Sequence, residues 1–170
     1  MSRFLCIFLG ICVVAFSTSV PGHAKEVVQG PEPVLLEITD ISSREKEVTI
    51  SLDLPALDGM ENQEIVTSTI WTNGVNRFEG VRLTELLKNL DLSGNKIRVT
   101  AINDYAVEFA LNEPLNDDAI VAFRMNGEPM SRRGKGPLWL LYPFDQSAKY
   151  RTETIYARSV WQLNRIDVIE

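Results

Sequence analysis

The alternation of apolar and polar residues predicts many short strands. Apolar side chains at every second position over 48–54 give the period of a strand with one buried face. The segment 64–71 is rich in β-branched residues, which favour extended backbone. By the same criteria, further strands are expected at 96–102, 105–111, 119–125, 138–142 and 160–169.

Helical periodicity is confined to short segments. Leu83, Leu86, Leu87 and Leu90 fall on one face of a helix, which ends before Ser93. Shorter helical turns are expected at 55–60, after Asn112 and at 152–158. Because only one helix is long enough for a crossover, a parallel βαβ array is disfavoured. The fold class expected is α+β, with a mixed β-sheet or partial barrel and a few short helices.

Residues 1–24 have the features of a secretory signal peptide. Arg3 supplies the positive start, the run 4–16 is apolar and uncharged, and Gly22-His23-Ala24 offers small residues for cleavage before Lys25. The alternative is an uncleaved membrane anchor, which the polar residues and Pro21 after the apolar run disfavour. We therefore expect a periplasmic or secreted protein whose residues 25–170 form a single domain.

The charge balance excludes one class of partner. The chain has 17 basic and 23 acidic residues, a net charge of −6, and removal of Arg3 with the leader makes it more negative. A protein of this charge is repelled by phosphate backbones, so nucleic-acid binding is not expected.

The positions of cysteine and histidine exclude several chemistries. Cys6, Cys12 and His23 are the only such residues, and all three lie in the expected leader. The mature domain therefore has no thiolate nucleophile, no Cys/His zinc site, no haem-ligating histidine and no Ser-His-Asp triad. No metal-ligating set is predicted.

Five stretches, in order, carry a family resemblance. They are Phe78–Leu87, Ala101–Tyr105, Ala122–Met130, Gly136–Pro143 and Ser159–Val168. Together they resemble the molybdopterin-binding domain of oxidoreductases, the fold of the sulfite oxidase catalytic core. The chain is similar to a short, exported, stand-alone version of that domain. The resemblance implies the fold, a molybdopterin cofactor and an oxidoreductase activity.

The chain departs from the family at the residue that ligates the metal. Family members hold molybdenum through the pterin dithiolene and one cysteine, and this resemblance implies a cysteine in the stretch Thr67–Thr72, which contains none. A hydroxyl of Ser68 or Thr69 is a harder and less acidic ligand than a thiol. Lys135, Trp139 and Trp161 stand where the family commonly has histidine, arginine and lysine.

Two hypotheses follow from this departure. In the first, the domain is an oxidoreductase-type protein with a degenerate metal site, which binds the cofactor without a protein sulfur ligand. In the second, the pocket belongs to a non-catalytic binding module for a small anionic or pterin-like ligand. That module would dock on a membrane-bound signalling or redox partner. The missing cysteine favours the second hypothesis for mechanism, and the shared motifs favour the first for ancestry.

The candidate cofactor-binding residues fall into two groups. Arg132, Arg133 and Lys135 form a dense cationic cluster with flexible glycines, which suits a pterin phosphate or another anion. The alternative for these residues is a solvated loop after the Asn126-Gly127 hairpin.

The second group is expected around a bound ring system. It consists of Asp104 and Tyr105, in a turn that the family places at the pocket rim, and of Trp139. Trp71, Trp139 and Trp161 could each offer a flat apolar face to a ligand, with core packing as the alternative. For Asp104 the alternative is ordinary turn chemistry.

Overall fold

A computed structural model of the chain describes residues 32–42 and 47–169. Its ten strands are β1 (Leu36–Asp40), β2 (Val48–Leu52), β3 (Asn62–Ser68), β4 (Val75–Arg82), β5 (Lys96–Ala101), β6 (Ala106–Ala110), β7 (Ile120–Met125), β8 (Glu128–Pro129), β9 (Leu138–Leu141) and β10 (Trp161–Ile169). The helices are α1 (Leu54–Asp58), α2 (Leu83–Asn89) and α3 (Glu153–Arg158), with 3-10 turns η1 (Pro114–Asp118) and η2 (Ala148–Tyr150).

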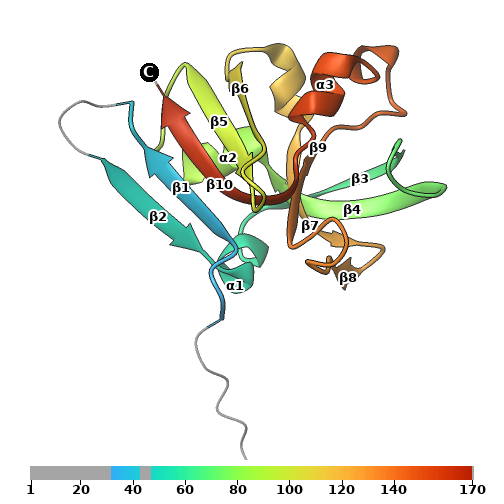
Figure 1. Cartoon of the computed structure of the whole chain (residues 1–170), viewed down its shortest axis with the longest axis horizontal. Helices are drawn as coiled ribbons and strands as arrows, with labels where there is room; N and C mark the ends of the chain where they lie inside the picture. The colour runs from blue at the N-terminus through green and yellow to red at the C-terminus, as the bar shows by residue number, and fades with distance from the viewer. Residues whose placement is uncertain (1–31, 43–46, 170) are drawn as a thin grey trace, which may run out of the picture. The chain divides into compact units, whose positions relative to one another are not determined.

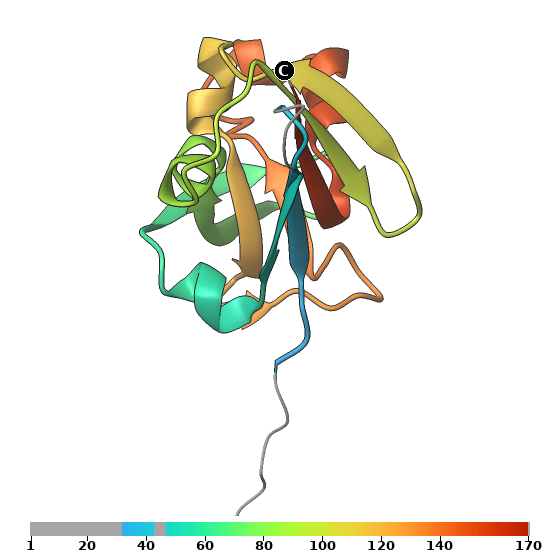
Figure 2. The same ribbon diagram turned by 90° about the vertical axis from the view of Figure 1, so that its left-hand side faces the viewer.

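The strands form one mixed sheet with a branch at β10. The main path runs β2-β1-β10-β9-β7-β4-β3, and the β5–β6 hairpin joins β10 on its other edge (Figure 1). Among the strand pairs of the described residues, only β1–β10 is parallel. Figure 2 shows β1 and the β5–β6 hairpin on opposite sides of β10. The α+β fold class with a mixed sheet is confirmed.

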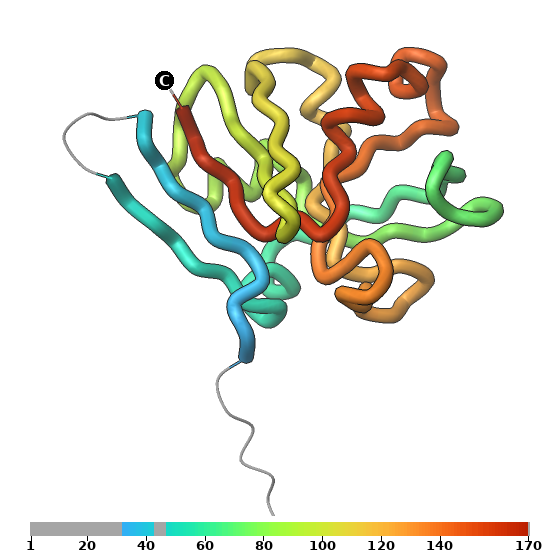
Figure 3. Tube along the Cα trace, viewed as in Figure 1, coloured from blue at the N-terminus to red at the C-terminus, as the bar shows by residue number. Residues whose placement is uncertain are grey.

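Strand β10 changes partners because it bends near its start. Trp161 and Leu163 pair with β9, whereas the strand from Arg165 onward lies between β1 and β5. At the bend, Gln162 has a φ of 52°, a left-handed conformation rare for a side chain other than glycine. The Cα trace in Figure 3 shows this turn of the chain. This bend separates the segment of β10 that pairs with β9 from the segment that lies between β1 and β5.

The core lies against the central strands β7 and β9. All four residues of β9 are buried, as are the first four of β7, so the continuous apolar run at 119–125 is confirmed as a central strand. Leu83, Leu86 and Leu87 of α2 are buried too, which confirms the predicted apolar helix face. The Asn126-Gly127 turn joins β7 to β8 with both residues at positive φ, as its sequence predicts.

Several predicted boundaries were wrong by a few residues; Leu54, for example, was expected in the strand 48–54 and begins helix α1. Strand β3 ends at Ser68, so Trp71 lies in the following loop rather than in the strand. The turn expected after Asn112 is the 3-10 helix η1, whose N-cap is Glu113. The expected leader, residues 1–24, lies outside the described residues. Within 32–42 and 47–169, no helix is long and apolar enough to cross a membrane.

A partly buried ion pair fastens the end of α3 to η1. The Arg158 guanidinium donates to both carboxylate oxygens of Glu113, at 2.7 and 2.9 Å, and Arg158 is only 8% exposed. The hydrogen bonds from Arg158 hold the pKa of Glu113 below its usual value, against the opposing effect of burial. Since α3 leads directly into Ser159, this pair helps to fix the chain that follows it.

We expect this pair to make stability depend on pH in the acid range. Because the pKa of Glu113 is lower in the folded than in the unfolded state, its contribution is complete above about pH 4.5 and is lost as the pH falls through the folded-state pKa. Glu113→Gln should therefore flatten the decline of the thermal midpoint between pH 5 and pH 3. Glu128→Gln, at an exposed carboxylate without an ion pair among the described residues, should keep the wild-type slope. Equal slopes for both variants would contradict the assignment.

Candidate functional site

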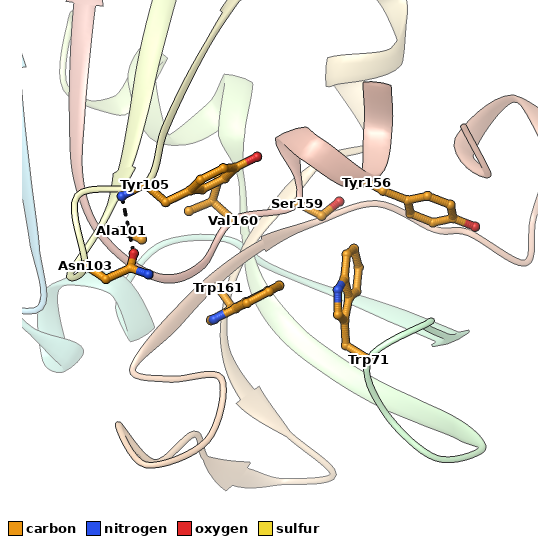
Figure 4. A pocket seen from close by; sticks show the side chains of 8 residues that line it. All are labelled: Trp71, Ala101, Asn103, Tyr105, Tyr156, Ser159, Val160 and Trp161. Atoms are coloured by element: carbon orange, nitrogen blue, oxygen red, sulfur yellow. Dashed lines mark hydrogen bonds between the residues drawn. The ribbon is translucent and has the colours of Figure 1, made fainter. Parts of the chain in front are cut away.

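A pocket of about 320 Å³ opens where β10 bends. It lies between the end of β5, the end of α3 and the loop after β3, so segments distant in sequence build it together. Its lining residues are Trp71, Ala101, Asn103, Tyr105, Tyr156, Ser159, Val160 and Trp161 (Figure 4). The lining is mainly apolar, with four aromatic rings, which is the composition of a small-molecule site.

Trp71 is the centre of the aromatic cluster beside this pocket. Its ring makes edge-to-face contacts with Trp139, Tyr156 and Trp161, with centroid distances of 5.7 to 5.8 Å. A further contact to Phe144 spans 6.1 Å. Such pairs stabilise beyond the area they bury. The loop after β3 is thus anchored to the core by its tryptophan.

The hydroxyls at the start of this loop are occupied by other contacts. Ser68 donates its hydroxyl to Asp145 at 2.8 Å, and its backbone N–H donates to the same carboxylate at 2.5 Å. The Thr69 hydroxyl lies 2.8 Å from that of Thr72 and accepts from the backbone N–H of Trp71 at 3.1 Å. Both side chains are therefore engaged in hydrogen bonds that shape the loop.

Asp145 holds the Trp71 loop in place from the opposite segment. Besides its two bonds from Ser68, its own backbone N–H donates to the Thr67 hydroxyl at 3.0 Å. The bonds from Ser68 hold the pKa of Asp145 below its usual value. We expect Asp145→Asn to speed amide hydrogen exchange across residues 69–74 at neutral pH, because an amide accepts these bonds more weakly than a carboxylate. Unchanged exchange in that loop would show that the aromatic packing alone holds it.

The cationic loop Ser131–Gly136 borders the pocket through Trp161. Gln162 braces it: the side-chain amide donates to the carbonyls of Arg132 and Gly134, and the backbone N–H donates to that of Lys135. The Lys135 ammonium lies 3.7 Å from the centroid of the Trp161 ring, a cation–π contact. Partial burial lowers the pKa of Lys135. Among the described residues, no carboxylate forms a salt bridge with this loop.

The structure places the predicted site residues at the rim of the pocket, in the loop beside it and in the core beneath it. Tyr105 lines the pocket, and Asp104 precedes it in the turn with a φ of 63°. Lys135 contacts the lining residue Trp161 but does not itself line the pocket. Arg132 and Arg133 lie in the same loop and are exposed.

Trp139 stands apart from the other predicted residues. It is fully buried, and its indole N–H donates to the carbonyl of Ser159 at 3.2 Å. Trp139 therefore supports the pocket from the core and does not line it.

Sequence reasoning missed part of the lining. Tyr156 had no local signal, since it lies on the short helix α3, outside the stretches of the family resemblance. Asn103, Ser159 and Val160 lie inside the motifs of the family resemblance, and these could have been nominated from them. Over the described ranges, no group of three or more His, Cys, Asp or Glu side chains is placed to hold a metal ion.

Comparisons with known proteins agree on the fold. Residues 23–167 match the family described as the oxidoreductase molybdopterin binding domain. Among solved structures, the fold is similar to that of the sulfane dehydrogenase SoxCD from Paracoccus pantotrophus, with a TM-score of 0.55 and 14% sequence identity. That match covers 79% of this chain but only 38% of the other. The curated proteins give no match.

Proposed function

Since this chain belongs to the oxidoreductase molybdopterin binding domain family, we propose that it is a binding module whose metal site is degenerate. In this proposal the pocket at the bend of β10 takes a small ligand in place of a protein-ligated molybdenum. The proposal includes export of the domain to the periplasm or the exterior. It also includes a membrane-bound signalling or redox partner that responds to the ligand.

The Trp71 loop is the observation that carries the proposal. The family resemblance puts a cysteine in this segment, and here it holds a tryptophan packed among four other aromatic rings. The nearby hydroxyls of Ser68 and Thr69 already bond to Asp145 and Thr72. Molybdenum held by a dithiolene finds no thiolate in the mature domain, so the residues present do not fit this coordination.

The aromatic lining favours binding over redox chemistry. Tyr105, Tyr156, Trp71 and Trp161 present flat apolar surfaces to one small pocket. None of these side chains is a metal ligand of the type that molybdenum prefers. Rings of this kind suit recognition of an organic molecule, because they bury a large area with little loss of side-chain entropy.

The decisive experiment measures cofactor content. The protein is expressed with its leader in a host that makes molybdopterin, beside a cysteine-containing family member as control. Molybdenum is measured by mass spectrometry, and pterin by the fluorescence of its oxidised form. We expect the control to carry both in stoichiometric amounts and this protein to carry no molybdenum. Stoichiometric molybdenum that changes oxidation state in this protein would overturn the proposal, and metal-free pterin would identify the ligand as the family's own.

A further inference from the structure

We infer that the ligand of this pocket is a small planar organic anion of the aromatic carboxylate class. The inference rests on the proposed function, because it names the ligand of the same pocket. It draws on three independent features: the flat walls, the hydrogen-bonding groups of the lining, and the charge of the neighbouring loop.

The aromatic side chains that line the pocket suit a flat, apolar ligand. Figure 4 shows the Trp71 and Trp161 rings beside one another, with the Tyr105 ring above Trp161. A volume of about 320 Å³ is at the small end of ligand sites and suits one or two fused rings. Tyr105 is 48% exposed, so a ligand stacked there would bury a ring that now faces solvent.

The hydrogen-bonding groups of the lining favour a ligand that accepts hydrogen bonds. The indole N–H groups of Trp71 and Trp161 and the amide NH₂ of Asn103 have no acceptor among the described residues. The hydroxyl protons of Tyr105 and Ser159 are already donated to backbone carbonyls.

No carboxylate belongs to the lining. Apart from the Tyr156 hydroxyl, which Figure 4 shows pointing away from the other lining side chains, the free side-chain donors are three nitrogen groups, which match the oxygens of a carboxylate.

The positive charge of the neighbouring loop also favours an anionic ligand. Lys135 lies against the Trp161 ring and forms no salt bridge within the described part of the chain. Arg132 and Arg133 add positive charge to the same exposed loop, in a protein that is acidic overall. Because Gln162 fixes the loop to the start of β10, this charge is held beside the pocket. An anion is attracted there and a cation is repelled.

Three matched probes test the ligand class. They are 2-naphthoate, its neutral amide 2-naphthamide and the cation 2-naphthylmethylammonium, each titrated into the full mature domain by isothermal calorimetry. We expect affinity to decrease in the order anion, neutral, cation, with about a tenfold gap between the first two, from the attraction of the neighbouring cationic loop. Lys135→Gln should reduce that gap to less than threefold. Lys96→Gln, at an exposed lysine at the far end of β5, should leave it unchanged.

The outcomes separate the ligand class from the proposed function. Equal binding of the three probes, or preference for the cation, overturns the anion inference while the binding pocket stands. Retention of the full gap in Lys135→Gln also overturns the inference. Failure of all three probes to bind, with a folded protein, counts against the inference and the binding module together. Molybdenum in the cofactor assay overturns the proposed function whatever the probes do.

Discussion

Gly80→Ala is expected to destabilise the domain by at least about 3 kcal/mol or to prevent its folding. A Cβ at this position would lie 2.2 Å from the carbonyl oxygen of Val121 and 2.5 Å from the Cα of Ala122. Both atoms belong to the backbone of β7, the central strand, so no side-chain rotation can relieve the overlap. The two strands would have to separate where their register already shifts between Glu79 and Gly80.

Urea denaturation followed by tryptophan fluorescence measures this effect. Gly134→Ala is the matched control, because its nearest neighbour would be the carbonyl oxygen of Ser131 at 3.5 Å, an ordinary contact. We expect the control to change stability by less than about 0.5 kcal/mol. A Gly80→Ala protein as stable as the control would mean that β4 and β7 can move apart at little cost. The glycine of the motif Phe78–Leu87 would then need another explanation.

Local patterns predicted the elements well because their physical causes are local. The alternation at 48–54, the leucine face at 83–90 and the Asn126-Gly127 turn each specify a conformation within a few residues. The structure has β2, α2 and the β7–β8 hairpin at these places. The family motifs added the fold, which periodicity alone left open between a mixed sheet and a partial barrel.

The pocket could not be derived in the same way. Trp71, Tyr105, Tyr156 and Trp161 come from four separate segments, and their meeting depends on the bend of β10. That bend places Gln162 at positive φ, which glutamine does not signal in a sequence. Gln162 also braces the cationic loop, so the residue that organises the site carried no chemical signal of its own.

Long-range contacts also decide whether an aromatic residue belongs to the core or to the site. Trp71 and Trp161 are partly buried and line the pocket, while Trp139 lies beneath them without exposed surface. All three follow or occupy strands, so their local secondary structure does not separate these environments. The difference comes from which face of which strand is covered by α3 and by the Trp71 loop.

Trp139→Ala is expected to cost about 3 to 5 kcal/mol of folding free energy, the range for removing a large buried aromatic side chain. The ring is fully buried and makes edge-to-face contacts with Phe78 at 5.5 Å and with Trp71 at 5.8 Å. Its removal would leave a cavity under the pocket and would free Trp71 on the side that now rests on the core. We therefore expect a lower urea midpoint together with weaker binding of 2-naphthoate.

Trp139→Phe separates the two roles of this side chain. Phenylalanine keeps much of the packing but cannot donate to the carbonyl of Ser159, a residue of the pocket lining. Because a buried carbonyl left without its donor costs about 1 to 3 kcal/mol, stability should fall less than in Trp139→Ala. If the hydrogen bond positions Ser159, binding of 2-naphthoate should weaken in Trp139→Phe even below the temperature at which the variant begins to unfold. Unaltered binding in a fully folded Trp139→Phe would confine Trp139 to a packing role and leave the shape of the pocket to Trp71 and the bend of β10.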